Sequence, residues 1–118
     1  MIFASRNESG VKAWKLVLDG KKTVTRRLKP QPVGVLRAVC PSRGKRQVCK
    51  IQILSCVDDT TWQMMFRSYR MRDVRRFLLQ EAHREGFKSW GGLQDWFYHK
   101  YGEYPQGLYR IEFRRVEE

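Results

Sequence analysis

The chain has 118 residues, a length that fits one domain over residues 1–118 and leaves no room for two. Hydrophobic residues make up 42% of the sequence, too many for a disordered chain, and no apolar run approaches the roughly 20 residues that span a bilayer. There are 24 lysines and arginines against 12 aspartates and glutamates, a formal net charge of +12. This charge favours RNA or another phosphate-bearing partner over a merely solvated basic surface, and the basic residues do not gather on one amphipathic helix as membrane binding requires.

The cysteines and histidines give no pattern typical of a metal site. Cys40, Cys49 and Cys56 form no CxxC pair, and His83 and His99 have no cysteine close to either. We therefore predict reduced thiols, no metal and no cofactor. Residues 1–20 lack the apolar core of a signal peptide, so we expect a cytoplasmic protein, and we expect a monomer.

The first half of the chain predicts one helix among strands. An apolar start at 1–5 indicates a strand, and the apolar spacing over 11–18 indicates a helix that ends at Gly20. A β-branched alternation predicts a strand over 23–28, which the proline-rich loop 29–32 ends. Two further strands are expected, at 35–40 and 47–57.

The second half predicts three helices and a closing strand. Residues 58–60 can cap a helix over 62–69, Asp73 can cap a second that ends at Gly86, and Ser89 can cap a third that ends at Gly102. The last strand is expected at 108–116. Because there is no βαβ rhythm, we predict an α+β domain in which about five mostly antiparallel strands curl into a small barrel with flanking helices.

The segment 20–27 is the densest candidate for function. It holds two hydroxyls and four cations directly after a helix end: Lys21, Lys22, Thr23, Thr25, Arg26 and Arg27. In a strand, Thr23, Thr25 and Arg27 share one face, and Lys22 lies in the turn before it. Such a cluster suits a phosphate or a carboxylate, although a solvated strand edge protected by lysine has the same composition.

Glu85 is the second candidate. It follows Val74 by 11 residues, which at about 100° per residue places it within roughly 20° of the apolar stripe, whereas Glu81 and Arg84 are predicted to point elsewhere. A carboxylate on the buried side of a helix needs a partner or a chemical role. The alternative is a frayed last turn in which Glu85 meets water.

Other polar and aromatic residues carry weaker signals. His83 stands alone on its helix, and a lone histidine is more often a surface residue than a catalyst. Most aromatic residues of 90–104 fit a core. Trp90 and Tyr104 lie off the helical stripe and could stack on a base, with packing as the alternative.

Three segments resemble the ASCH family, named for the activating signal cointegrator homology domain. Residues 20–27, with the sequence GKKTVTRR, resemble its GxKxxTxR signature, and Glu81-Ala82-His83-Arg84-Glu85-Gly86-Phe87 resembles its AxxEGF helix end. Residues 108–113 look like its closing strand, and the opening together with 29–32 is similar to small phage and prophage ASCH proteins. The resemblance covers nearly the whole chain. It implies a PUA-like β-barrel with flanking helices and RNA-related roles.

One bacterial branch of this family hydrolyses N4-acetylcytidine to cytidine and acetate, and its catalytic lysine, threonine and glutamate fall on Lys22, Thr25 and Glu85. The leading hypothesis is therefore an amidohydrolase acting on an acylated cytosine, free or in RNA. Thr25 would attack, Lys22 would activate it or hold the oxyanion, and Glu85 would carry the proton. The substrate or RNA would be bound by Lys21, Arg26, Arg27 and Trp90.

Two departures from that branch are the basic stretch 67–76 and the high net charge, which suit a polymer substrate or plain RNA binding. The alternatives are accordingly a non-catalytic RNA-binding module and a phage accessory protein that binds a host protein.

Overall fold

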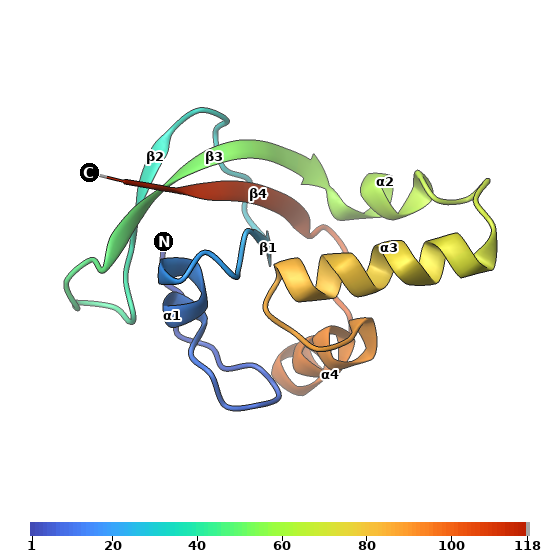
Figure 1. The fold of residues 1–118 in the computed structure, drawn as a ribbon, viewed down its shortest axis with the longest axis horizontal. Coiled ribbons are helices and arrows are strands. Elements are labelled where there is room, and N and C mark those ends of the chain that lie inside the picture. The colour runs from blue at the N-terminus through green and yellow to red at the C-terminus, as the bar shows by residue number, and fades with distance from the viewer. Residues whose placement is uncertain (118) are drawn as a thin grey trace.

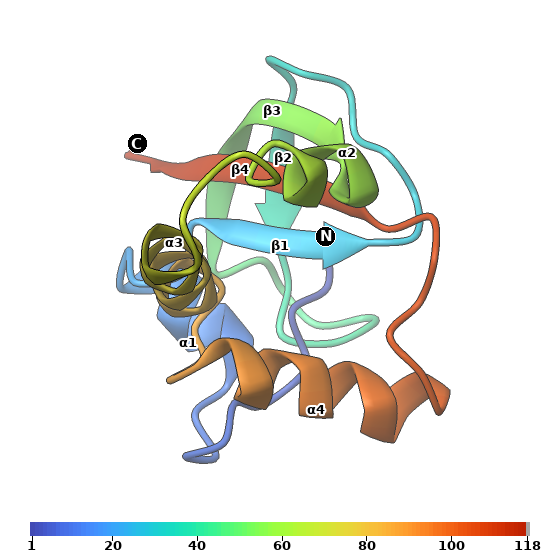
Figure 2. The ribbon, with the colours of Figure 1, turned by 90° about the vertical axis from the view of Figure 1, so that its right-hand side faces the viewer.

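The protein is described over residues 1–117 by a computed structural model (Figure 1). Its helices are α1 (Ala13–Leu18), α2 (Asp59–Met64), α3 (Met71–Arg84) and α4 (Trp90–Tyr101). Its strands are β1 (Val24–Arg27), β2 (Leu36–Val39), β3 (Cys49–Asp58) and β4 (Tyr109–Val116). Helices α1 and α4 lie below the curved sheet in Figure 1, and Figure 2 shows β1 running above α4.

The sheet is antiparallel throughout, with the strand order β1-β4-β3-β2. In the pairing of β1 with β4, Thr25 lies opposite Ile111 and Arg26 lies opposite Arg110. A bulge between Ile53 and Ser55 shifts the register of β3 against β4. The α+β class with antiparallel strands is confirmed.

The predicted fifth strand at 1–5 and the closed barrel are wrong for the described residues, where four strands form a sheet that does not close. The N-terminal segment makes only one parallel bridge, from Ile2 to Cys40. It cannot extend this ladder because the carbonyls of Phe3 and Ser5 accept hydrogen bonds from the first two amides of α1, at 3.1 and 2.8 Å. The apolar start of the chain therefore anchors a helix instead of widening the sheet.

The main hydrophobic core lies between the sheet and α1. It explains why apolar and polar residues alternate along the strands. Side chains on one face of β2, β3 and β4 meet the apolar stripe of α1 and the N-terminal segment, and burial of each large apolar side chain contributes roughly 1.5–3 kcal/mol. The buried residues of this cluster are Phe3, Ala13, Val17, Val39, Ile51, Ile53, Ile111 and Phe113.

Two of the three predicted N-terminal caps, those of α2 and α4, are present in the structure. Asp58 Oδ1 accepts a hydrogen bond from the Thr61 amide at the start of α2, and Ser89 Oγ accepts one from the Gly92 amide at the start of α4. Helix α3 begins at Met71, so Asp73 does not cap it. Asp73 lies in the first turn instead, where its charge still favours the positive end of the helix dipole.

Gly86 ends α3 with a backbone that only glycine fits well. Its φ is +92°, and a Cβ at this position would lie 2.7 Å from Leu16 Cδ1 of α1. The turn at Gly86 brings the last residue before it, Glu85, against the start of β1. Within residues 1–117, no helix has the length and apolar composition to cross a membrane.

Candidate functional site

A cavity of about 330 Å³ lies between the N-terminal segment, β1, the end of α3, and α4. Its polar lining includes Ser5, Lys22, Thr25, Arg26, Arg27, Glu85 and Lys100. Its walls include the rings of Phe3, Phe87, Trp96, Phe97 and Tyr101. Residues from two distant segments of the sequence, 22–27 and 85, thus face one space. A cavity of this size is typical of small-molecule sites.

Lys22 is buried in this cavity, with 6% of its surface exposed. Its Nζ donates a hydrogen bond to the backbone carbonyl of Glu85 at 2.7 Å and lies 3.8 Å from Glu85 Oε1. Burial lowers the pKa of Lys22 to about 8, with the nearby Glu85 carboxylate opposing the shift and the charge of Arg27 adding to it. The amine can therefore exchange a proton near neutral pH.

Thr25 is buried on β1, and its hydroxyl contacts a cation. Arg27 Nε donates a hydrogen bond to Thr25 Oγ1 at 3.3 Å, and Arg27 Nη2 donates one to the Ile2 carbonyl at 2.8 Å. The Arg27 guanidinium also lies over the Phe3 ring, 4.7 Å from its centre. Between residues 1 and 117, no direct hydrogen bond joins the Thr25 hydroxyl to Lys22 or Glu85. Thr25 shares the cavity with both, and a proton between them would pass through water or substrate.

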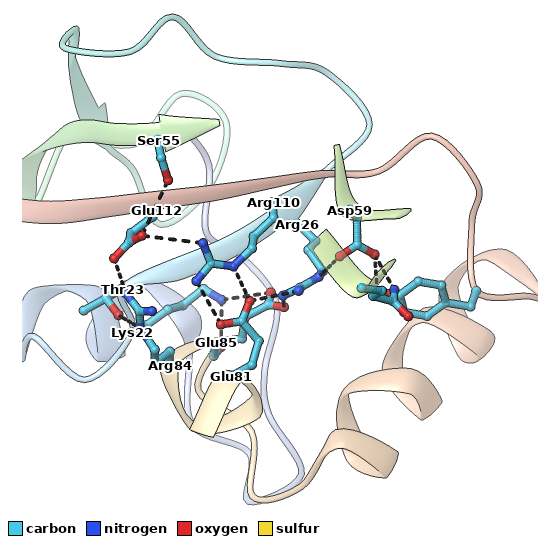
Figure 3. Close-up of polar contacts among 12 residues, drawn as sticks. Lys22, Thr23, Arg26, Ser55, Asp59, Glu81, Arg84, Glu85, Arg110 and Glu112 are labelled. Atoms are coloured by element: carbon cyan, nitrogen blue, oxygen red, sulfur yellow. Dashed lines mark hydrogen bonds and ion pairs between the residues drawn. The ribbon is translucent and has the colours of Figure 1, made fainter. Parts of the chain in front are cut away.

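Arg26, expected to bind substrate, is held by three buried carboxylates (Figure 3). Its Nε donates to Asp59 Oδ1 at 2.7 Å and its Nη1 donates to Glu85 Oε2 at 2.5 Å. Its Nη2 forms an ion pair with Glu81 Oε2 at 2.8 Å that lacks the alignment of a hydrogen bond. Burial alone would lower the pKa of Arg26, but these carboxylates raise it above its ordinary value. Arg26 therefore positions Glu85 and has no free charge for a ligand.

Glu81 is the residue that sequence reasoning misplaced. It is buried, and both its oxygens accept hydrogen bonds from Arg110, with Arg110 Nη2 at 3.0 Å from Oε1. The prediction that Glu81 points away from the stripe is wrong because residues at i and i+4, here 81 and 85, share a helix face. Burial raises the pKa of Glu81, but the hydrogen bond from Arg110 and the charges of Arg26 and Arg110 outweigh this and hold the pKa below its ordinary value.

Glu81 also explains how two arginines can face each other in the sheet. Arg26 and Arg110 are directly opposite on β1 and β4, a pairing of like charges that destabilises a sheet. Glu81 lies between them and forms an ion pair with each (Figure 3). Sequence reasoning missed this cluster, since Asp59 was expected only among the residues that cap a helix and no pattern singled out Arg110.

Trp90 packs against Arg26 and Trp62 and does not line the cavity. Its ring stacks on Trp62 at 6.3 Å, and the Arg26 guanidinium lies 5.3 Å from its centre. Tyr104, the other suggested stacking residue, donates its hydroxyl proton to Asp59 Oδ2 at 2.8 Å. The cavity walls come instead from Trp96, Phe97 and Tyr101 of α4. Phe97 and Tyr101 are spaced i, i+4, a signal that could have indicated this face.

The remaining candidates lie outside the cavity. Lys21 is exposed in the turn before β1. His83 is exposed, and its Nε2 lies 3.1 Å from the Lys88 carbonyl oxygen. Over the described residues 1–117, no group of three or more histidine, cysteine, aspartate or glutamate side chains is arranged to hold a metal ion.

Comparison with known proteins identifies the fold. No protein-family model and no curated protein matches the sequence. Among solved structures, the chain is similar to the crystal structure of an ASCH domain from Lactobacillus crispatus JV V101, with a TM-score of 0.57 and 22% sequence identity. The similarity covers 90% of this chain and 71% of that chain. The chain therefore has the fold of an ASCH domain.

Proposed function

We propose that the cavity hydrolyses the amide of an N4-acylated cytosine, with N4-acetylcytidine as the simplest substrate. The observation that carries this proposal is the buried amine of Lys22, whose pKa is lowered to about 8 and which shares a cavity with the Thr25 hydroxyl and Glu85. A hydroxyl, a base active near neutral pH and a carboxylate are the parts that acyl transfer to a threonine needs.

The first half of the reaction forms an ester on Thr25. Neutral Lys22 takes the hydroxyl proton, by way of water or the substrate, as Thr25 Oγ1 attacks the acyl carbon and the carbonyl π electrons move to the carbonyl oxygen. Arg27 Nε, which donates a hydrogen bond to Thr25 Oγ1, stabilises the negative charge on this oxygen while its proton leaves. The bond from the acyl carbon to N4 then breaks. The proton held by Lys22 returns to N4, by way of the Glu85 carboxylate, and cytidine leaves.

The second half of the reaction restores the protein. Water, deprotonated by neutral Lys22, attacks the ester carbonyl, and the bond to Thr25 Oγ1 breaks. The proton on Lys22 passes to Thr25 Oγ1, and acetic acid leaves and loses its proton to water to give acetate. Arg26 Nη1 donates a hydrogen bond to Glu85 Oε2, which leaves Oε1, 3.8 Å from Lys22 Nζ, for proton exchange.

The aromatic rings of the cavity suit a flat, partly apolar ligand. Trp96, Phe97 and Tyr101 offer ring faces or edges to a pyrimidine, and Lys100 lies over Trp96 at 5.0 Å from its centre. Lysine at the rim is suited to a phosphate, which would let the site take a nucleotide within RNA as well as a nucleoside.

A second candidate function is a non-catalytic RNA-binding module, favoured by the net charge of +12. It would use the same cavity to recognise a base. Turnover separates the two functions, because a binding module releases no cytidine. The test is chromatography of N4-acetylcytidine, and of an oligonucleotide that contains it, after incubation with the protein. Conversion of N4-acetylcytidine to cytidine, either as the free nucleoside or within the oligonucleotide, supports the hydrolase. Intact substrate in both reactions contradicts it.

A further inference from the structure

Besides the segment 20–27, positive charge is concentrated in residues 64–76, which we call the α2–α3 projection. Five arginines lie within ten positions, at Arg67, Arg70, Arg72, Arg75 and Arg76, with Asp73 as the one acidic residue among them. All five are exposed. In Figure 1 this part of the chain extends beyond the end of the sheet, away from α1.

These guanidinium groups differ from the other arginines described above. Arg26, Arg27 and Arg110 are tied to carboxylates or carbonyls. Among residues 1–117, no hydrogen bond or ion pair holds the guanidinium groups of the projection, whose arginines stand exposed. A dense set of unpaired arginines costs self-repulsion, which an anionic partner relieves.

The arginines of α3 lie on one face of that helix. Arg72, Arg75 and Arg76 are spaced i, i+3 and i+4, on the side opposite to the buried Glu81 and Glu85. Tyr69, half exposed, lies in the turn before α3, where its ring contacts Phe66 and Phe77 at 5.8 and 5.6 Å. A row of arginine guanidinium groups can bind successive phosphates of a nucleic-acid strand, and an exposed aromatic ring in the preceding turn can stack on one of its bases.

We propose that the α2–α3 projection binds the phosphate backbone of single-stranded RNA through Arg72, Arg75 and Arg76, with Tyr69 stacking on a base. This surface is separate from the cavity, and the inference goes beyond the proposed hydrolysis. Arg72 and Glu85 belong to the same helix and lie about 20 Å apart along it at ~1.5 Å per residue.

The test compares two triple variants that lose the same charge. R72Q/R75Q/R76Q alters the projection, and the control R43Q/K45Q/R46Q alters the exposed loop between β2 and β3 at the other end of the sheet. Each lowers the formal net charge of +12 by three. Binding of fluorescein-labelled oligouridine is followed by anisotropy over a salt series, and circular dichroism checks the fold of each variant.

We expect the projection variant to lose roughly tenfold or more in affinity at low salt, and the slope of log affinity against log salt to fall by about 2, from about 0.7 for each lost phosphate contact. The control variant should lose much less. Equal losses in the two variants, or no loss in the projection variant, would overturn the proposal.

The choice of RNA over other anions is tested with the same proteins. Polyglutamate should displace the labelled strand far less well than unlabelled oligouridine, and phosphatidylserine vesicles should bind the wild type no better than the projection variant. Equal displacement by polyglutamate, or arginine-dependent vesicle binding, would overturn the assignment to RNA. Hydrolysis of free N4-acetylcytidine, measured in parallel, should be unchanged in the projection variant, so that failure of the cavity's function and failure of the RNA surface appear in different assays.

Discussion

Lys22 Nζ donates a 2.7 Å hydrogen bond to the backbone carbonyl of Glu85, which lies 63 positions later in the chain. This contact joins the turn before β1 to the last turn of α3. It depends on Gly86, whose positive φ turns the chain just after that carbonyl. The two segments of the candidate site are thereby held together by backbone as well as by side-chain charge.

The first prediction concerns the pH dependence of turnover. If Lys22 acts as the base, kcat/KM for N4-acetylcytidine should rise with pH and level off above about 8, the pKa to which burial lowers this amine. The rise reflects the growing neutral fraction of the amine. A rate that falls as pH passes 8 would show that the charged amine is the active form, and would contradict the role of Lys22 as base.

The second prediction concerns stability at alkaline pH. Because the pKa of Lys22 falls from 10.5 in the unfolded chain to about 8 in the folded protein, the unfolded state binds more protons between these values, and stability should rise with pH across this window. Relative to Lys22→Met, the wild type should gain about 3 kcal/mol in the free energy of unfolding. Urea denaturation at several pH values measures this. The exposed Lys21→Met serves as control: it keeps Lys22, so its stability should rise with pH in parallel with that of the wild type. Parallel curves for wild type and Lys22→Met would refute the buried amine.

The third prediction concerns Arg26. Replacing it with methionine leaves Asp59, Glu81 and Glu85 without their shared cation, and an uncompensated buried charge costs about 3–5 kcal/mol. Thermal or urea unfolding should show this loss, whereas Arg46→Met in an exposed loop should change stability by about 0.5 kcal/mol or less. Similar stability of the two variants would mean that the carboxylates do not depend on Arg26.

The fourth prediction separates two tryptophans of α4. Trp96 lines the cavity, whereas Trp90 packs on Trp62 and Arg26. Trp96→Leu should raise KM several-fold with little change in stability, and Trp90→Leu should lower stability by about 1–3 kcal/mol while KM stays near that of the wild type. Steady-state kinetics and urea denaturation of both variants check this, and the reverse pattern would place the substrate beside Trp90 instead of Trp96.

Periodicity and capping signals predicted most of the fold, because they report interactions local in sequence. The helix ends at Gly20, Gly86 and Gly102 all have positive φ, as their position after an apolar stripe indicates. The strand expected at 1–5 failed, since its carbonyls are taken by α1, a choice that no local pattern reveals.

The candidate site was predictable only in part. The burial of Glu85 followed from helical spacing, and the cavity brings it to Lys22 and Thr25. The binding of Arg26 by three carboxylates could not be predicted, because Asp59 and Glu81 reach it from separate helices. Long-range ion pairs of this kind leave no periodic signal in the sequence.

The central claim is that Thr25 is the nucleophile, and two conservative variants test it. Val is close to Thr in shape and keeps the β-branching that suits β1, so Thr25→Val should fold normally without a nucleophile. Thr25→Ser keeps the hydroxyl and serves as the matched control.

The decisive measurement is the rate of cytidine release from N4-acetylcytidine by wild type, Thr25→Val and Thr25→Ser, followed by chromatography. Removal of a nucleophile costs several powers of ten in turnover, whereas loss of one uncharged hydrogen bond costs only about 0.5–1.5 kcal/mol. The account predicts release by wild type and Thr25→Ser and a loss of at least roughly a thousandfold in Thr25→Val. Release by Thr25→Val within about tenfold of the wild type, or none by the wild type, would contradict it.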